Sequence, residues 1–452
     1  MNAPQATHLS PARSHALGRL AVAAWLALGV TSGANAQNLV ELYEAARLYD
    51  ATFLSARSQY EANLFRADQA RAGLLPEVGL GAAASWARRD INNGPGSTSN
   101  SQSATLAASQ PLYRPANRIA NDQALLSVDV AKAALTLAEQ DLIVRTTQAY
   151  FDVLAATDTL AFVRAQKTAV GEQLAAAKRN FEVGTTTVTD SREAQAGFDL
   201  VVAQEIAAEN DLRVKQLALN QLVGMASVVP KPLAAPVVLP PLLPADPQAW
   251  VALNDETHPT ILQATRGLEI AEFETRKAEA GHKPTLDLVA QYQVARAPST
   301  TTLTQNTVRS NNASVGVQFN MPLFAGYAIQ NRVMETLSLQ DKARTDLEAA
   351  RRGVDLATRS AFLGVLSGQG QVKALEAAEA SSQSALDANR LGYQVGVRIN
   401  IDVLNAQSQL FQTKRDLAQA RYNVLLGGLR LKQASGKLVP EDLLPINSLL
   451  AK

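Results

Sequence analysis

Near its C-terminus the chain carries apolar residues at every seventh position, the spacing of helices that wind around one another. This track is made of Val403, Leu410, Leu417, Val424 and Leu431. A second track at the same spacing is mostly small, with one threonine: Ala406, Thr413, Ala420, Gly427 and Ala434. A seven-residue repeat indicates left-handed coiled-coil packing, and small residues let more than one neighbouring helix approach closely. This pattern alone also fits an ordinary antiparallel coiled coil in a soluble protein.

Two long stretches without proline give room for such helices. They hold 114 and 117 residues and lie between Pro115 and Pro230 and between Pro322 and Pro440. Each is interrupted once by a glycine among β-branched residues, at 183–187 and 395–398, which favours the end of a helix. We therefore predict helical hairpins over about 116–223 and 327–436. Their first arms, 116–182 and 327–394, would each reach roughly 100 Å at about 1.5 Å per residue.

Four shorter segments alternate apolar and polar residues with a period of two, as strands do. They are residues 77–88, 103–112, 285–294 and 313–323. In the last of these, Val315, Val317 and Phe319 alternate with small or polar residues. Each segment is 10 to 12 residues long, which suits a tilted strand that turns one face to lipid and the other to a lumen. A single segment of this kind also occurs in soluble amphipathic hairpins.

The two halves of the chain repeat each other, which strengthens the strand prediction because the hairpins fall at equivalent places. Residues 181–184 return as 393–396, and Asp190 returns as Asp402, at an offset of 212. We read this as a duplicated α/β module. The predicted organisation is a first repeat over 37–229 with a strand hairpin at about 77–113, a proline-rich connector over 230–247, a second repeat over 248–438 with a strand hairpin at about 285–324, and a tail over 439–452.

Four strands cannot close a membrane barrel within one chain. Known membrane barrels begin at about 8 strands, and open sheet edges are not tolerated in lipid. Three chains would supply 12 strands, and two chains would supply eight. A trimer is the simplest arrangement that closes a barrel of pore-forming size, although counting strands does not exclude a dimer.

The N-terminus has the pattern of a secretory signal. Two arginines precede the apolar run 20–30, and Ala34-Asn35-Ala36 forms a small-x-small cleavage site. The prediction is a signal peptide over 1–36 and a mature chain that begins at Gln37. A short membrane anchor is the alternative, but the apolar run is well below the roughly 20 residues that span a bilayer. Further along, no run of 18 apolar residues occurs, so no transmembrane helix is expected.

Composition argues against several classes of function. The net charge of +1 argues against a nucleic-acid partner, whose binding surface would be strongly basic. There is no cysteine, and beyond residue 36 the only histidines are His258 and His282. Metal-ligand spacings, nucleophile elbows and phosphate-binding loops are also missing from the sequence. We therefore expect no catalytic residues, no cofactor, no metal site and no enzymatic activity.

At the tips of the predicted hairpins the sequence resembles a known family. The motifs are Phe181-Glu182-Val183-Gly184 followed by Asp190, and Tyr-x-Val-Gly-x-Arg-x3-Asp-Val-Leu beginning at Tyr393. With the signal and the duplicated strand pairs, residues 38–446 resemble TolC-type outer membrane factors. The resemblance implies an α+β membrane protein: a trimeric channel-tunnel in which a 12-stranded β-barrel, four strands per chain, continues into a long α-helical coiled-coil barrel.

The resemblance also implies a function and partners. The expected protein is an outer membrane exit duct that projects into the periplasm, part of a tripartite efflux pump or a type I secretion system. It would be a homotrimer embedded in outer membrane lipid, a passive channel opened when a periplasmic adaptor and an inner-membrane transporter dock. The competing interpretation is a periplasmic coiled-coil adaptor or scaffold, which would share the signal and a helical hairpin but lack duplicated hairpins with paired strands.

Site residues follow from the same resemblance. It implies a gate in which Tyr393 and Arg398 on the second tip contact Thr189 and Asp190 on the first. Asp402 matches an acidic ring at the pore constriction. Where the family often has a second aspartate, this chain has Asn405, so we expect weaker block by multivalent cations. The adaptor-docking tips would be Val183, Gly184, Thr185, Val395, Gly396 and Val397.

Overall fold

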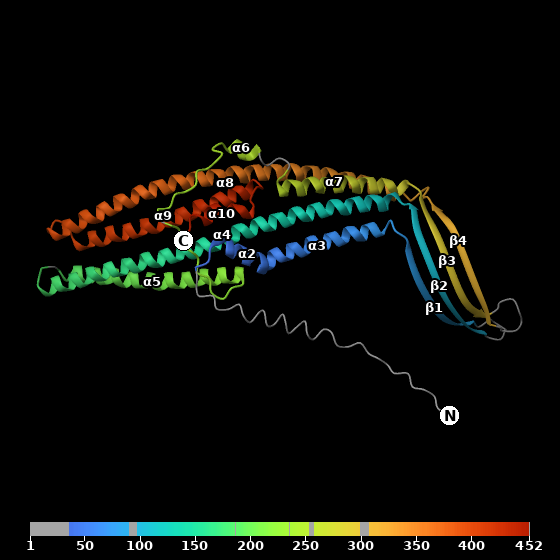
Figure 1. Ribbon diagram of the computed structural model, residues 1–452, viewed down its shortest axis with the longest axis horizontal. Coiled ribbons are helices and arrows are strands. Elements are labelled where there is room, and N and C mark those ends of the chain that lie inside the picture. The colour runs from blue at the N-terminus through green and yellow to red at the C-terminus, as the bar shows by residue number, and fades with distance from the viewer. Residues whose placement is uncertain are drawn as a thin grey trace, which may run out of the picture.

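The computed structural model describes residues 36–89, 97–185, 187–234, 236–252, 257–298 and 307–451. The molecule is elongated, with a sheet at one end and two helical hairpins at the other (Figure 1). Apart from Ala36, the predicted signal peptide lies outside the described residues. None of the described helices combines the length and the hydropathy that a membrane-spanning helix needs.

The sheet holds four antiparallel strands in the order β1-β2-β3-β4. Their bounds are Glu77–Arg89 for β1, Ser97–Tyr113 for β2, Thr285–Pro298 for β3 and Thr307–Asn320 for β4. The central strands β2 and β3 come from different halves of the chain and pair directly, with Leu106 opposite Tyr292. Within the described residues β1 and β4 each keep one unpaired edge, so the sheet is not closed within one chain.

The strands extend beyond their predicted ends toward the connecting segments. β2 begins at Ser97 rather than 103, because Ser99 and Ser101 continue the ladder opposite Ala87 and Ser85. Polar strand residues give no alternation signal, which is why sequence patterns missed them. β4 stops at Asn320, short of the predicted 323, since Pro322 has no N–H to donate to a ladder.

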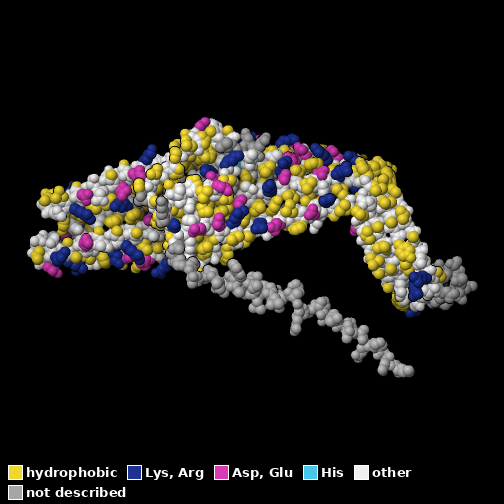
Figure 2. Space-filling view, viewed as in Figure 1, with side chains coloured by type: hydrophobic (Ala, Val, Ile, Leu, Met, Phe, Trp, Pro, Cys, Tyr) yellow, Lys and Arg dark blue, Asp and Glu magenta, His cyan; other side chains and the backbone are white. Residues whose placement is uncertain are grey.

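One face of the sheet is apolar and exposed. Alternation places its members on every second position, and the largest are Val78, Leu80, Trp86, Leu106, Tyr292, Val315, Val317 and Phe319. The space-filling view shows this apolar surface over the strands (Figure 2). A contiguous exposed apolar surface of this kind belongs to a face that meets lipid or another protein rather than water.

Two very long helices form the body of the molecule. They are α4, Pro115–Glu182, and α8, Ala328–Gln394, of 68 and 67 residues. At about 1.5 Å per residue each spans roughly 100 Å. Shorter helices lie along them in two tiers. α3, Ala51–Ala72, and α7, Pro259–Glu279, pack near the sheet, whereas α5, Val188–Val223, and α9, Asn400–Ala434, pack toward the far end (Figure 1).

The seven-residue track of α9 is buried, as coiled-coil packing requires. Its members are between 1% and 5% exposed: Val403, Leu410, Leu417, Val424 and Leu431. Part of the track packs against buried residues of α8, with Leu386 in the cluster of Val403 and Leu410. The second hairpin is therefore a coiled coil along its length.

The largest core lies midway along the molecule, where the halves of the chain meet. Residues of α4, α5 and α9 pack there with α2, Leu39–Tyr49, and α10, Leu443–Asn447. The proline-rich connector joins this region through backbone hydrogen bonds, since Lys231 N donates to Gln37 O over 3.2 Å and Ala451 N donates to Pro232 O over 2.8 Å. The short helix α6, Pro247–Ala252, buries Trp250 in a separate cluster with Phe362 and Leu431.

Candidate functional site

Both helical hairpins turn through the same backbone motif. The glycines Gly184 and Gly396 adopt φ of 75° and 80°, the left-handed region that side chains with a Cβ rarely occupy. Thr185 N donates to Asn180 O over 2.8 Å, and Val397 N donates to Gly392 O over 2.9 Å. This is the Schellman motif, in which a residue beyond the helix satisfies a carbonyl of its last turn.

The residues of the predicted docking tips lie at the exposed ends of these turns. The side chains of Val183, Val395 and Val397 are 72%, 65% and 75% exposed. Apolar side chains held this far out of a fold are available to a partner with an apolar surface. The two tips are nearly the same in backbone and in exposure, which follows from the duplication.

The acid of the first tip is used in capping its own helix. Thr187 N donates to the Asp190 carboxylate over 3.0 Å, and Asp190 N donates to the Thr187 hydroxyl over 3.3 Å. This reciprocal pair is a capping box at the start of α5, and the aspartate also opposes the positive end of the helix dipole. Thr189 is exposed beside it.

The second tip lacks such a cap. Ile399 precedes α9 and makes no side-chain capping hydrogen bond. The acid Asp402 lies 3.5 Å from the guanidinium of Arg398, which is four residues earlier in the chain and just outside α9. A Cβ at Gly392 would lie 2.7 Å from Arg398 Cγ, so the glycine leaves the space in which the arginine stem rests. This ion pair is solvent-exposed, with 59% of the Arg398 side chain accessible, and such pairs hold weakly.

Few side-chain contacts join the tips within one chain. Asn180 Nδ2 donates to the Tyr393 hydroxyl over 3.4 Å, a long hydrogen bond. Two helical turns before Asn180 in α4, the side-chain amide of Gln173 donates a hydrogen bond to Asn400. Among the described residues of this single chain no ion pair joins Arg398 to Asp190. The gate contacts with Thr189 and Asp190 therefore stay a prediction.

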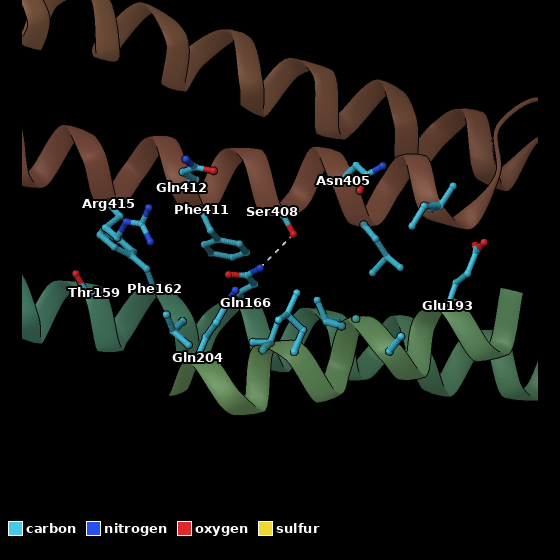
Figure 3. A pocket seen from close by; sticks show the side chains of 18 residues that line it. Thr159, Phe162, Gln166, Glu193, Gln204, Asn405, Ser408, Phe411, Gln412 and Arg415 are labelled. Carbon is cyan, nitrogen blue, oxygen red and sulfur yellow. Dashed lines mark hydrogen bonds between the residues drawn. The ribbon is translucent and has the colours of Figure 1, made fainter. Parts of the chain in front are cut away.

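A groove separates the hairpins just behind the tips. It measures about 540 Å³ and lies between α4 and α5 on one side and α9 on the other. Phe162 and Phe411 point into it, and Gln166 Nε2 donates across it to Ser408 Oγ over 3.1 Å (Figure 3). Asn405 lines the same groove. The interface between the hairpins is thus incompletely filled near the tips.

Farther from the tips, α4 and α9 are joined by a buried cluster. The rings of Phe151 and Tyr422 stack at 5.3 Å, and the Tyr422 hydroxyl donates to Asp158 Oδ2 over 2.7 Å. Phe151 and Tyr422 are 2% and 5% exposed. Burial raises the pKa of the Asp158 carboxyl above its ordinary value, although the Tyr422 hydrogen bond opposes this. We call Phe151, Asp158 and Tyr422 the equatorial cluster.

Comparison with known proteins decides the family. The model of the family described as "Outer membrane efflux protein" matches residues 42–225 and 252–437. The two matched segments are the two halves of the chain, which confirms the duplication. The chain belongs to the outer membrane efflux protein family. The predicted fold class, with four strands per chain, and the outer membrane location are confirmed, and the protein is an outer membrane exit duct of the efflux and secretion type.

Two relatives match nearly the whole length of this chain. The outer membrane protein TolC of Escherichia coli is 32% identical over 438 residues, which are 94% of this chain and 87% of the relative. The alkaline protease secretion protein AprF of Pseudomonas aeruginosa is 30% identical over 421 residues, 90% and 86% of the two chains. Among solved structures, the CmeC outer membrane channel of Campylobacter jejuni matches with a TM-score of 0.76 at 16% identity, over 99% and 97% of the chains.

Several residues at the tips of this family member were not predicted from the sequence. Asn180, Gln173 and Asn400 connect the hairpins, and Gly392 makes room for Arg398. A single polar residue near a helix end carries no periodic signal, so the first three could not be found by pattern. The Arg398–Asp402 pair could have been, because opposite charges four residues apart at the start of a predicted helix lie close together.

Proposed function

We propose that three copies of the chain assemble into one channel-tunnel. The observation that carries this is the four-stranded sheet, which has an exposed apolar face and an unpaired edge on β1 and on β4. Edge strands in lipid need partners, and three copies give a closed ring of 12 strands of a size known for membrane barrels. The helical hairpins of the three copies would then form a wall around a common axis.

Assembly is tested by the mass of the purified protein in detergent. Sedimentation or native mass spectrometry of the full-length protein should give three chains per particle, and removal of detergent should cause aggregation. Two chains per particle would favour an eight-stranded barrel. A monomer that stays soluble without detergent would contradict the duct and favour the adaptor interpretation.

The division of the chain is part of the proposal. The first repeat over 37–229, the connector over 230–247, the second repeat over 248–438 and the tail over 439–452 follow the order of elements. Cleavage of a signal peptide over 1–36 fits the contacts of Gln37, whose N donates to Val229 O, and the capping box of Asn38 with Glu41 that opens α2. N-terminal sequencing of the exported protein should begin at Gln37; a retained N-terminus would contradict it.

The gate is proposed to work between hairpin tips. Among the described residues the exposed guanidinium of Arg398 forms one ion pair, with Asp402, so it is available to a second carboxylate. Asp190, only partly exposed in its capping box, offers a fixed acceptor, with Thr189 beside it. Tyr393 adds a hydroxyl that already meets Asn180 in one chain. Charge-assisted contacts of this kind are stronger than neutral ones but remain breakable in water.

The pore constriction is proposed at Asp402. Three copies would place three carboxylates around the axis, which favours cations. Asn405, one turn later, adds no charge, so block by multivalent cations should be weak. Reversal potentials in a salt gradient test this: Asp402→Asn should lose cation preference, and an unchanged potential would remove Asp402 from the constriction.

Docking is proposed at the tips. Each chain has one motif of Val183, Gly184 and Thr185 and a second of Val395, Gly396 and Val397, which gives six motifs per trimer. The proposal is supported by the exposed valines at the turns that Gly184 and Gly396 form. The partner is a periplasmic adaptor that in turn binds an inner-membrane transporter, and the duct itself acts as a passive channel rather than an enzyme. Capture of the adaptor by the wild type, and its loss with Val395→Asp and Val397→Asp, would test the site.

A further inference from the structure

Two arginines face each other on the apolar side of the sheet. Arg296 in β3 is directly opposite Arg309 in β4, and both are exposed. Counting by twos along each strand puts Arg296 on the face of Leu286 and Arg309 on the face of Phe319, which is the outward apolar face. We call Arg296 and Arg309 the arginine pair. Basic side chains gather at this end of the sheet in the space-filling view (Figure 2).

The height of the arginine pair is that of a membrane surface. Leu286 opposite Phe319 and Arg296 opposite Arg309 are separated by ten residues along the strands, or about 33 Å. With the tilt of about 35–45° usual for membrane strands, this corresponds to roughly 25 Å along the membrane normal, the height of the apolar band of a barrel. The pair therefore sits where the apolar band ends and lipid headgroups begin.

The sheet itself supplies no counter-charge to these arginines. The described strands contain only two acids, Glu77 and Asp287, and both lie at the opposite end. Asp287 is moreover engaged by Arg114 in a two-pronged ion pair of 2.7 Å bonds. The segment 299–306 that joins β3 to β4 has no acidic residue in its sequence. Like charges directly opposite on a sheet destabilise it, so an external anion would relieve the repulsion.

We propose that the arginine pair binds a phosphate group of an outer-leaflet lipid. Two guanidinium groups at one height match the several oxygens of a phosphate, which they hold by paired hydrogen bonds. Gln102 of β2, opposite Arg296 and on the same face, adds an amide donor at the edge of the site. The favoured ligand is a phosphorylated glycolipid whose acyl chains lie along the apolar strands below. This inference rests on the proposed assembly in the outer membrane.

The test uses the full-length protein in neutral detergent and bisphosphorylated lipid A as the probe, with bound lipid counted by native mass spectrometry. Replacing both arginines by glutamine (Arg296→Gln, Arg309→Gln) should weaken lipid A binding roughly 30-fold. The double lysine variant should retain part of the affinity, because it keeps charge but loses the planar fork. Arg351→Gln on exposed α8 makes the same charge change away from the sheet and should leave binding unaltered.

Thermal melting separates lipid binding from a purely structural role. The order of the melting temperatures of wild type and variant should reverse when lipid A is added. Without lipid A the double glutamine variant should melt at or above the temperature of the wild type, because a like-charge contact is gone. With lipid A the wild type should be the more stable. Equal lipid binding by wild type and variant would overturn the proposal, as would a variant that melts lower without lipid. Equal protection by inorganic phosphate would show that no lipid is recognised.

Failure of the proposed trimer would be detected separately from failure of the lipid site. The same mass spectra give the number of chains per particle before any lipid is added. A particle that is not a trimer would contradict the proposed function, whereas a trimer with unaltered lipid binding in the double glutamine variant would contradict only the lipid site.

Discussion

The two helical hairpins meet in two places, and the chemistry differs between them. At the equatorial cluster, Phe151 stacks on Tyr422 and both are buried. Toward the tips Leu404 still packs with Val163, Val170 and Val201. At the tips themselves the contacts are polar and few, such as the 3.4 Å bond from Asn180 to Tyr393. Buried aromatic packing stabilises an interface far more than exposed polar contacts do. The comparison indicates a molecule fixed at its middle and loosely held at its tips, where the proposed opening on docking requires movement.

The largest effect should come from disrupting the equatorial cluster in the middle of the molecule. Phe151→Ala removes a buried ring from the equatorial cluster and should lower the free energy of unfolding by about 3–5 kcal/mol. Thermal melting of the purified protein in detergent measures this. Phe162→Ala, on the same helix but lining the open groove, is the matched control and should cost much less. Equal losses would mean that the middle is no firmer than the tips.

The next largest effect is expected at the hairpin tips. Arg398→Ser with Tyr393→Phe should remove contacts of about 1–3 kcal/mol each, shifting the duct toward its open state without unfolding it. Single-channel conductance in a planar bilayer should rise several-fold, while the melting temperature changes little. Arg390→Ser changes an exposed arginine on α8, the helix that carries Tyr393, and should leave conductance unaltered. A double variant with wild-type conductance would remove these residues from the gate.

A smaller effect should distinguish the two tips from each other. Thr187→Ala breaks the capping box of α5 and should cost about 1 kcal/mol, seen as faster hydrogen exchange in the first turn of that helix. Ile399→Ser adds the missing cap to α9 and should slow exchange there. If Thr187→Ala leaves exchange unchanged, the first tip does not owe its order to the cap.

The smallest predicted effect is a pH dependence at the equatorial cluster. Burial raises the pKa of Asp158 above its ordinary value of 3.8, so the folded chain holds this proton more tightly than the unfolded chain. The contribution of Asp158 to stability is therefore greatest at low pH and declines as pH rises through its folded pKa. Asp158→Asn should flatten the dependence of the melting temperature on pH in the range above the ordinary carboxyl pKa of 3.8. A variant as pH-dependent as the wild type would contradict this.

Periodic features of the fold could be predicted from the sequence, whereas isolated contacts could not. The seven-residue track ending at Leu431 and the alternation around Phe319 repeat often enough to identify a coiled coil and a strand. The polar beginning of β2 at Ser97 was missed because its serines alternate with other polar residues, Thr98, Asn100 and Gln102. At the tips, glycine positions fixed the turns, but the partners of Tyr393 and Arg398 depend on how two hairpins lie side by side, which no local pattern encodes.

The central claim, a fixed middle with movable tips, is tested most directly by distances between subunits. The chain has no cysteine, so one introduced cysteine per subunit can carry a spin label, at exposed Val397 for the tip or at exposed Leu444 for the middle. With Arg398→Ser and Tyr393→Phe, pulsed electron spin resonance should show longer distances at position 397 and unchanged distances at position 444. Unchanged distances at both positions, or equal shifts at both, would contradict the account.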